Sequence, residues 1–294
     1  MDLREALKRK RVLIADGATG TQLQKAGLPA GYSPELWNLE NPAAILSHHN
    51  SYLAAGADII LTNTFGGNPI KLSARNLEDK TQEINKRAAE LAKEAAGNNH
   101  FVFGDVGPTG HLFTPLGDLS EEAAIAAFSV QISALVAGGV DAILIETMSA
   151  LEEAKAAIKA AKSVTDLPIL VTMSFETRGR TMMGVKPSQA VSELWNLGID
   201  VIGANCGRTL TDTLTAIQEM KMANPEIILM AKPNAGLPHL DNNQSVYDVS
   251  PETMAEYALK FAAEGVKIFG GCCGSNPDHI KAVAKALNSI ALPY

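Results

Sequence analysis

The segment Val266-Lys-Ile-Phe-Gly-Gly-Cys-Cys-Gly274 is a short apolar run that ends in glycines and two adjacent cysteines. Seven other short, apolar, β-branched segments recur along the chain. Most are apolar almost without interruption, which is typical of strands buried on both faces of a parallel sheet. The predicted strands are residues 12–16, 58–65, 101–106, 141–146, 168–175, 201–206, 226–234 and 266–273.

Alanine-rich segments lie between these strands, and several end on glycine just before the next strand, as in Gly138-Gly-Val-Asp141. Glycine directly after a helix is a common connection from helix to strand. The predicted helices are residues 42–55, 81–96, 121–137, 150–164, 189–197, 211–222, 251–264 and 277–289. Eight strand–helix units predict a single α/β domain, a (β/α)8 TIM barrel over residues 1–294. A doubly wound sheet is the alternative, but no Gly-x-Gly-x-x-Gly follows the first strand.

The composition limits the class of protein. Hydrophobic residues make up 46% of the chain, enough for a sizeable core, and the formal net charge is −7. Such an acidic chain lacks the basic face that duplex nucleic acid requires, so no nucleic-acid partner is expected. No run reaches the roughly 18 apolar residues of a membrane span. The charged residues 1–11 lack the apolar core of a signal peptide. We therefore expect a cytoplasmic protein that does not associate with membranes.

The carboxyl ends of the predicted strands carry most of the unusual chemistry. Each of the eight ends bears a polar group, a thiol or a glycine, and the opposite ends show no such concentration. In a barrel these carboxyl ends converge on one mouth, where functional residues gather. The sequence therefore predicts a single site at this mouth.

All three cysteines of the chain lie at strand ends: Cys206 closes one predicted strand, and Cys272 and Cys273 close another. In a reducing compartment such cysteines favour metal binding or catalysis over disulfides. Adjacent strand residues point to opposite faces, so the backbone must leave the strand if both thiols are to reach one metal. The flanking glycines permit that turn. Three thiolates would form a zinc site with an open fourth position, as in catalytic zinc. Small buried hydrophobic residues are the alternative.

Other polar strand ends supply candidates for substrate binding. Asp16 and Glu146 each end a strand, and either could hold a substrate ammonium group, act as a base or cap the next helix. Residues 17–20, Gly-Ala-Thr-Gly, present backbone N–H groups that could cradle a carboxylate or a phosphate. Asn234 ends a further strand between proline and alanine, where an Asx-turn is the alternative.

The histidines are less informative than the cysteines. His111 and His239 fall in loops at the mouth and could touch a substrate. His48 and His49 lie in the middle of a predicted helix and are interpreted as surface or packing residues, and His279 falls in the first turn of the last helix.

The strand-end motifs together resemble the homocysteine S-methyltransferase family. They are Asp16-Gly-Ala-Thr-Gly20, Thr62-Asn-Thr-Phe-Gly66, Gly107-Pro-Thr-Gly110, Asn205-Cys206, Pro233-Asn-Ala-Gly236 and Gly270-Gly-Cys-Cys-Gly274. The last motif, together with the upstream Asn-Cys pair, is highly specific for that family. The resemblance covers essentially the whole chain, and it is closest to the homocysteine-binding barrel of cobalamin-dependent methionine synthase.

The resemblance implies a zinc-loaded barrel and assigns roles to the candidate residues. Cys206, Cys272 and Cys273 would be the zinc ligands. Asn234 would occupy the fourth position until the sulfur of homocysteine displaces it. The resemblance implies that the carboxylates of Asp16 and Glu146 bind the amino group of homocysteine. The backbone amides of Gly17, Ala18 and Thr19 would bind its carboxylate.

The activity that the resemblance implies is zinc-dependent methyl transfer to L-homocysteine, which yields methionine. A full cobalamin-dependent methionine synthase also carries folate, cobalamin and reactivation modules, which these 294 residues do not include, so we expect either an excised fragment or a stand-alone enzyme. The expected donor is therefore methylcobalamin on a separate corrinoid protein. The alternatives are a small donor, which would be S-methylmethionine, S-adenosylmethionine or betaine, or another thiol as acceptor. Betaine is disfavoured because only 5% of residues are aromatic, few for a cage around a quaternary ammonium.

Two readings from other classes remain open at this stage. An aldolase-like or phosphate-binding barrel could use residues 270–274 for a phosphate and Lys232 for a Schiff base, but it leaves the cysteines unexplained. A non-enzymatic zinc-binding protein would need a closed site with four ligands, and the chain offers only three cysteines.

Overall fold

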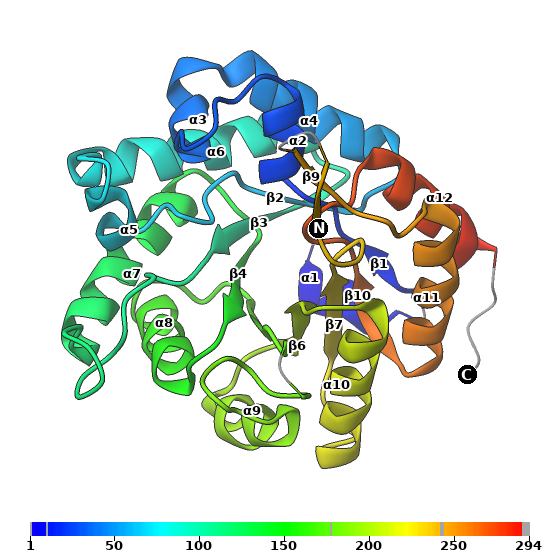
Figure 1. Cartoon of the computed structure of the whole chain (residues 1–294). Coiled ribbons are helices and arrows are strands. Elements are labelled where there is room, and N and C mark those ends of the chain that lie inside the picture. The colour runs from blue at the N-terminus through cyan, green and yellow to red at the C-terminus, as the bar shows by residue number, and fades with distance from the viewer. Residues whose placement is uncertain (1, 10, 177, 242–243, 290–294) are drawn as a thin grey trace.

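The computed structural model describes residues 2–9, 11–176, 178–241 and 244–289, which form a closed barrel of parallel strands (Figure 1). The sheet runs in the order β1-β10-β7-β6-β5-β4-β3-β2. A bridge between Ala15 and Ile59 joins β1 to β2 and closes the ring. The predicted (β/α)8 TIM barrel is therefore confirmed. The barrel strands are β1 (Leu13–Ile14), β2 (Ile59–Leu61), β3 (Phe101–Val106), β4 (Ala142–Met148), β5 (Ile169–Met173), β6 (Val201–Cys206), β7 (Leu229–Pro233) and β10 (Val266–Phe269).

Helices wrap the outside of this barrel (Figure 1). The longer ones are α4 (Pro42–Ala54), α6 (Thr81–Ala96), α7 (Glu121–Ala137), α8 (Leu151–Val164), α9 (Pro187–Leu194), α10 (Leu210–Ala223), α11 (Pro251–Ala263) and α12 (Pro277–Asn288). Shorter helices are α1 (Leu3–Leu7), α2 (Gly20–Lys25), α3 (Trp37–Glu40) and α5 (Pro69–Ser73), and β8 (His239–Asp241) pairs with β9 (Gln244–Val246) in a hairpin. Within the described ranges, every helix is too short or too polar to cross a bilayer.

The predicted element boundaries agree with the structure where the apolar pattern alone sets them. β3, β6, α6 and α7 match their predicted ranges. β10 ends at Phe269, four residues before the predicted end, because the glycines after it lead the backbone out of the strand. The helix predicted over 189–197 begins at Pro187, which is suited to the first helical turn, and its last three residues are a 3₁₀ turn, Trp195–Leu197. His48 and His49 are both buried, so they are packing residues rather than surface ones.

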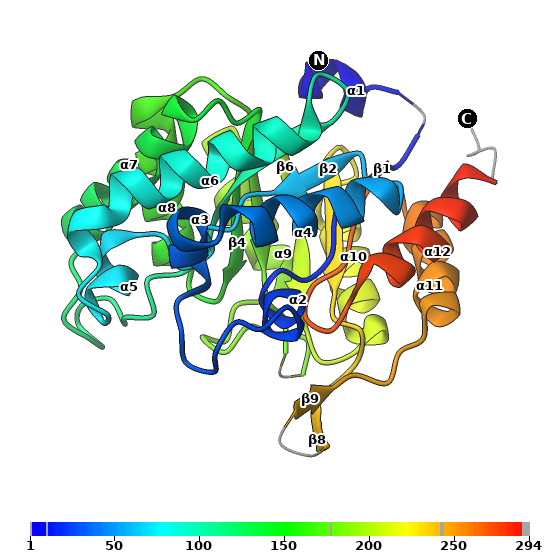
Figure 2. The ribbon, with the colours of Figure 1, turned by 90° about the horizontal axis from the view of Figure 1, so that it is seen from above.

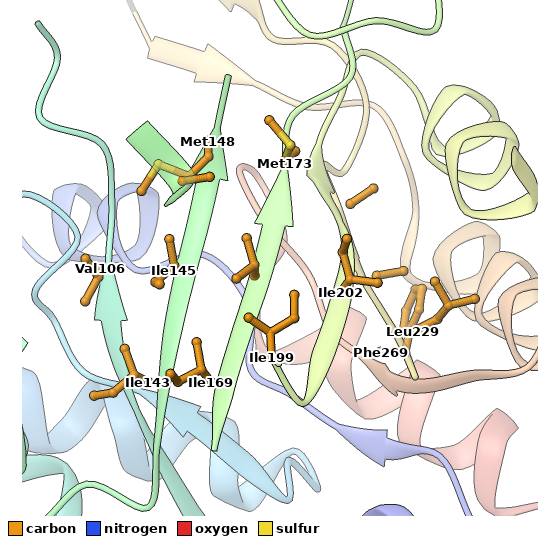
Figure 3. Close-up of a cluster of buried hydrophobic side chains, with 14 of the residues drawn as sticks. Val106, Ile143, Ile145, Met148, Ile169, Met173, Ile199, Ile202, Leu229 and Phe269 are labelled. Carbon is orange, nitrogen blue, oxygen red and sulfur yellow. The ribbon is translucent and has the colours of Figure 1, made fainter. Parts of the chain in front are cut away.

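Apolar side chains fill two regions that the strands separate. Phe103, Leu144 and Met230 belong to a cluster inside the barrel. Residues that alternate with them, such as Ile143 and Ile145, face outward and pack beneath the helices (Figure 3). This alternation is what a barrel requires, since successive side chains point to opposite faces of the sheet.

Helix α1 closes the end of the barrel opposite the mouth. Leu3 and Leu7 are part of the inner cluster, and Arg4 pairs with Asp200, just before β6, at 2.6 Å. The β8–β9 hairpin extends from the other end (Figure 2). Helix α1 therefore covers one end of the barrel, and the mouth at the other end is free for a site.

Truncation of the α1 plug should destabilise the whole barrel. Leu7→Ala removes a side chain that is only 4% exposed, and we expect it to lower the free energy of unfolding by about 2–5 kcal/mol. Met222→Ala, at a side chain that is 76% exposed, is the control and should change it by less than about 0.5 kcal/mol. Urea unfolding measures both, and equal effects would mean that α1 does not help to stabilise the core.

Candidate functional site

A pocket of about 430 Å³ opens at the carboxyl ends of the strands. Loops after β1, β2 and β10 contribute to its wall, together with residues near the carboxyl ends of β3, β4, β6 and β7. Seven of the candidates from the sequence line it, and they are Gly17, Ala18, Thr19, Glu146, Cys206, Cys272 and Cys273. Asp16 and Asn234 are not among its lining residues. The expectation of a single mouth site therefore holds for most of the candidates.

The three cysteines converge at the base of this pocket. Their sulfur atoms all lie within 4.8 Å of one another, and the Sγ atoms of Cys206 and Cys272 are 3.0 Å apart. Cys206 adopts a left-handed backbone conformation with φ of 55°, which turns its side chain at the end of β6. After β10 the chain turns immediately, and the N–H of Ser275 donates to the oxygen of Cys272 at 3.1 Å. Both cysteines of the pair can therefore face the same point.

Glycine is required in this turn because the loop runs against the end of β1. A Cβ atom on Gly270 would lie 2.8 Å from the Cβ of Ala15 and 2.8 Å from the oxygen of Asp16. These contacts are closer than carbon atoms tolerate. The glycines beside the cysteine pair thus serve close packing as well as the turn that the sequence predicts.

The donor set fits a soft divalent cation. Hydrogen bonds from Cys206 and Cys272 lower the pKa of the Cys273 thiol. The pKa of Cys206 is raised well above its ordinary value because its thiol is hydrogen-bonded to Cys272 and Cys273. Three sulfurs this close share protons unless a cation balances their charge, and a thiolate cluster is the ligand type that zinc prefers.

Asn234 has a free acceptor beside this cluster. Its Nδ2 donates to the oxygen of Gly207 at 2.9 Å, and its backbone N–H donates to the oxygen of Cys206 at 3.3 Å. Its Oδ1 is buried and has no hydrogen-bond partner within the described residues. An unpaired buried acceptor is costly, so a ligand that binds this oxygen would relieve that cost.

A group of buried charged residues also lies at the pocket, close to Cys272. The Nζ of Lys232 on β7 lies 2.8 Å from the Oε2 of Glu146 on β4. Asp16 and Asp105 complete the group, and all four side chains are almost fully buried. The group therefore holds three carboxyls and only one ammonium in a place of low dielectric constant.

This shortage of positive charge shifts the pKa values. Burial raises the pKa of Asp16 to about 7, although Lys232 opposes that shift. Burial and the charge of Glu146 raise the pKa of Asp105 well above its ordinary value. Burial alone would lower the pKa of Lys232, but the carboxyls around it, Glu146 above all, raise it. Lys232 therefore stays protonated.

Asp105 lines the pocket although the sequence analysis gave it no role, and Lys232, which also lines it, was considered there only as a Schiff-base lysine. Asp105 ends the motif Gly104-Asp105 on β3, and one of its carboxyl oxygens, Oδ1, has no partner in the described structure. The signal that could have found it is a carboxylate at the end of an otherwise apolar strand, which is the same signal that singled out Asp16 and Glu146.

Hydrogen bonds to two neighbouring side chains hold the glycine-rich turn after β1. The N–H of Ala18 donates to the Oγ of Ser275 at 3.1 Å, and Tyr52 donates to the oxygen of Ala18 at 2.9 Å. The amide of Ala18 is therefore already engaged. The amides of Gly17 and Thr19 show no such bond in the described part of the chain.

The mouth histidines are not in the main pocket. His111 lies in a neighbouring cleft, 3.7 Å from Asp118, and His239 lies 3.3 Å from Asp248. His279 belongs to the capping box of α12, as its place in the first turn of the last helix predicts.

The profile of the homocysteine S-methyltransferase family matches residues 13–287. The chain belongs to the homocysteine S-methyltransferase family. It is 33% identical to a methionine synthase of Mycobacterium leprae and 31% identical to one of Mycobacterium tuberculosis, over 97% and 99% of its own length. It spans about a quarter of the length of these two relatives, 25% and 26%.

Solved structures of two methyltransferases share the barrel. The homocysteine methyltransferase MmuM from Escherichia coli, in its metallated form, superposes with a TM-score of 0.82 at 25% identity. The match covers 96% of this chain and 99% of that one. A methyltransferase from Methanosarcina mazei has the same fold, with a TM-score of 0.67 at 12% identity.

The buried carboxyl of Asp16 should make stability depend on pH. Because its pKa is raised from 3.8 to about 7, the folded protein holds a proton that the unfolded chain has lost between these values, so stability falls as pH rises through this range. Asp16→Asn should remove up to about 1.4 kcal/mol of that fall per pH unit. Urea unfolding at several pH values tests this, with the exposed Asp118→Asn as control. Parallel profiles for Asp16→Asn and the unmodified protein would contradict it.

Proposed function

We propose that this chain is a zinc-dependent thiol methyltransferase that transfers a methyl group to L-homocysteine and produces methionine. The observation that carries the proposal is that three cysteine sulfurs within 4.8 Å of one another share one pocket with a buried carboxyl group. A reactive sulfur and a substrate ammonium would need these two features in one pocket. Residues 1–294 would act as one domain, in the cytoplasm, where thiols stay reduced.

The metal would be held by Cys206, Cys272 and Cys273, with the Oδ1 of Asn234 in the fourth position until substrate arrives. When bound, zinc lowers the pKa of a substrate thiol, so that the reactive thiolate is present at neutral pH. The residues of this chain supply the geometry, because the barrel fixes all three sulfurs at strand ends.

The amino group of homocysteine would meet the surplus of buried carboxyls. Lys232 neutralises Glu146, which leaves Asp16 and Asp105 without a cation of their own. A substrate ammonium placed against the group would supply the missing positive charge. It would also favour ionisation of carboxyls whose pKa burial raises. Asp16, Asp105 and Glu146 would therefore select an amino-bearing thiol.

The carboxylate of homocysteine would lie against the turn after β1. The amides of Gly17 and Thr19 are available for it, and that of Ala18 would join them only by sharing its proton with Ser275. With the ammonium and the carboxylate both held, the thiol would be oriented toward the cysteines, which lowers the entropic part of the barrier.

The methyl donor would be methylcobalamin on a separate corrinoid protein. The similarity to two methionine synthases supports this donor. A small donor is the second candidate, and the match to the Escherichia coli homocysteine methyltransferase over 99% of that chain favours it. Among small donors, betaine is disfavoured because Phe65 is the one aromatic residue in the described lining of the pocket.

The readings from other classes gain no support from the geometry. A Schiff-base lysine must lose its proton to attack a carbonyl, whereas the pKa of Lys232 is raised by the carboxyls around it. The cysteine cluster also opens into a pocket rather than lying in a closed site, as a purely structural metal would require.

Removal of one thiol should remove the metal. Cys272→Ser replaces a thiolate by a hydroxyl that stays protonated, and we expect zinc affinity to fall by more than about 100-fold, beyond the loss seen for outer-shell partners. Zinc content by atomic emission and methionine formation measure the effect, with circular dichroism as the check on folding. Ser192→Ala on the surface of α9 is the control. Full zinc content and turnover in Cys272→Ser would refute the proposed centre.

Methyl transfer should depend on both zinc and the amino group of the acceptor. We expect the zinc-loaded protein to demethylate free methylcobalamin with L-homocysteine, which changes the corrin absorbance, and to form methionine. The control acceptor 4-mercaptobutyrate lacks the amino group and should react at least about tenfold more slowly. Turnover with S-methylmethionine or S-adenosylmethionine, but not with methylcobalamin, would establish the second candidate instead.

A further inference from the structure

Asn205 lies one residue before the first cysteine and has no role in the function proposed above. It is the penultimate residue of β6, and its side chain is 1% exposed. Its Oδ1 accepts the backbone N–H of Thr147 at 2.9 Å and the hydroxyl of Thr172 at 2.8 Å. The side chain therefore links the ends of β4, β5 and β6 beneath the cysteine cluster.

The other half of the amide faces the sulfurs. Nδ2 donates to the Oγ1 of Thr147 at 2.6 Å, and it lies 3.7 Å from the Sγ of Cys206 and 3.9 Å from the Sγ of Cys272. Both distances suit an N–H that two sulfurs share. The described structure shows no such contact between Asn205 and Cys273.

The orientation of this amide is decided by its surroundings. A backbone N–H can only donate, so the atom that faces the N–H of Thr147 must be the oxygen. Rotation of the amide by 180° would place two donors, its NH₂ group and the backbone N–H of Thr147, against each other. The N–H groups of Asn205 are thus directed at the sulfurs by a fixed partner on the far side.

Two unusual backbone conformations accompany this arrangement. Thr147 has a φ of 63° and Cys206 a φ of 55°, a region that side chains other than glycine rarely adopt. Thr147 is also β-branched, for which the conformation is especially costly. The two hydrogen bonds between Thr147 and Asn205 hold Thr147 in its conformation, and Asn205 directly precedes Cys206 in the chain. The side-chain amide of Asn205 is therefore fixed in position beside the cysteine cluster.

In a methyl-transfer site, the cysteine thiolates can be methylated in place of the substrate. The cysteine sulfurs are nucleophiles of the same kind as the substrate sulfur. If one of them attacked, a bond from cysteine sulfur to methyl would form, the bond from methyl to its carrier would break, and the electron pair would leave with the carrier. The product, an S-methylated cysteine, would no longer be a thiolate ligand.

We propose that Asn205 is a positioning residue that protects Cys206 and Cys272 from methylation by donating its N–H to their sulfurs. Hydrogen bonds to a thiolate stabilise its lone pairs, and its nucleophilicity falls as its basicity falls. The substrate sulfur, on the open side of the cluster, receives no such bond from Asn205. The inference rests on the proposed function for its purpose, but the hydrogen bonds themselves do not depend on that function.

The test compares how fast each cysteine is methylated by methyl iodide in the full chain without homocysteine. Fragment mass spectra distinguish Cys206, Cys272 and Cys273. Asn205→Ala removes the N–H groups, and in zinc-loaded protein, where the sulfurs are already thiolates, we expect methylation of Cys206 and Cys272 to accelerate about fivefold or more. Cys273, which Asn205 does not contact, should change by less than about twofold and serves as the internal reference.

Thr172→Val is the matched control, since it removes one bond to the oxygen of the same amide and leaves the N–H groups in place. It should leave all three rates unchanged. Asn205→Asp is the second variant if the alanine variant does not fold, because it keeps the acceptor for Thr147 and loses the donor. Unchanged rates at Cys206 and Cys272, or an equal rise at all three cysteines, would overturn the proposal.

The comparison is made with zinc-loaded protein and with reduced, metal-free protein. In metal-free protein the thiols also hold protons, so loss of the N–H donor should lower the thiolate fraction and slow methylation at Cys206 and Cys272 relative to Cys273. This series tests the hydrogen bonds even if the chain neither binds zinc nor methylates homocysteine. Failure of the methyl-transfer assay together with these selective changes at Cys206 and Cys272 would therefore refute the function and support the role of Asn205. Methyl transfer to homocysteine without that selectivity would support the function and refute the role of Asn205.

Discussion

The structure of the mouth depends on the convergence of three sulfur atoms from two different strand ends. β6 and β10 are separated in the sheet by β7, so neither strand could present its cysteines to the other while it remained extended. The convergence is achieved where the strands end: Cys206 takes a left-handed conformation, and the chain after Phe269 turns at once on glycines that fit against Ala15 and Asp16. The bends at both strand ends, and the residues that hold them, follow from this requirement.

The second constraint is electrostatic, and it acts across the same pocket. Three buried carboxyls and one lysine leave a deficit of positive charge that solvent cannot relieve. Lys232 keeps its proton because removing it would leave the carboxyls without any cation, and breaking such a buried pair typically costs about 3–5 kcal/mol. A site with this imbalance is prepared for a cationic group. This is a physical reason for it to prefer an amino acid over a simple thiol.

The two halves of the pocket are mechanically connected. Ser275 accepts the N–H of Ala18 and donates its hydroxyl proton to the oxygen of Cys272 at 2.7 Å, so the turn after β1 and the cysteine loop share one side chain. Tyr52 on α4 supports both by donating to the oxygens of Ala18 and Ser275. Asn205 plays a comparable part on the opposite side, where it joins three strand ends. A displacement of the cysteine loop would therefore also shift the amides proposed for the substrate carboxylate.

The sequence by itself determined the barrel, because uninterrupted apolar runs that alternate with alanine-rich helices leave few other arrangements in which both faces of each strand are covered. It also determined which end carries the site, since the cysteines, Asp16 and Glu146 all fall at the carboxyl ends of strands. Only the tertiary structure decided how these groups pair. Glu146 and Lys232, which form the buried ion pair, are 86 residues apart along the chain, and the amide of Ala18 is engaged by Ser275 from the far end of the sequence. Such pairings depend on barrel register and on where each loop turns. A local pattern does not contain that information, because it reports which side chains are buried and not which of them meet.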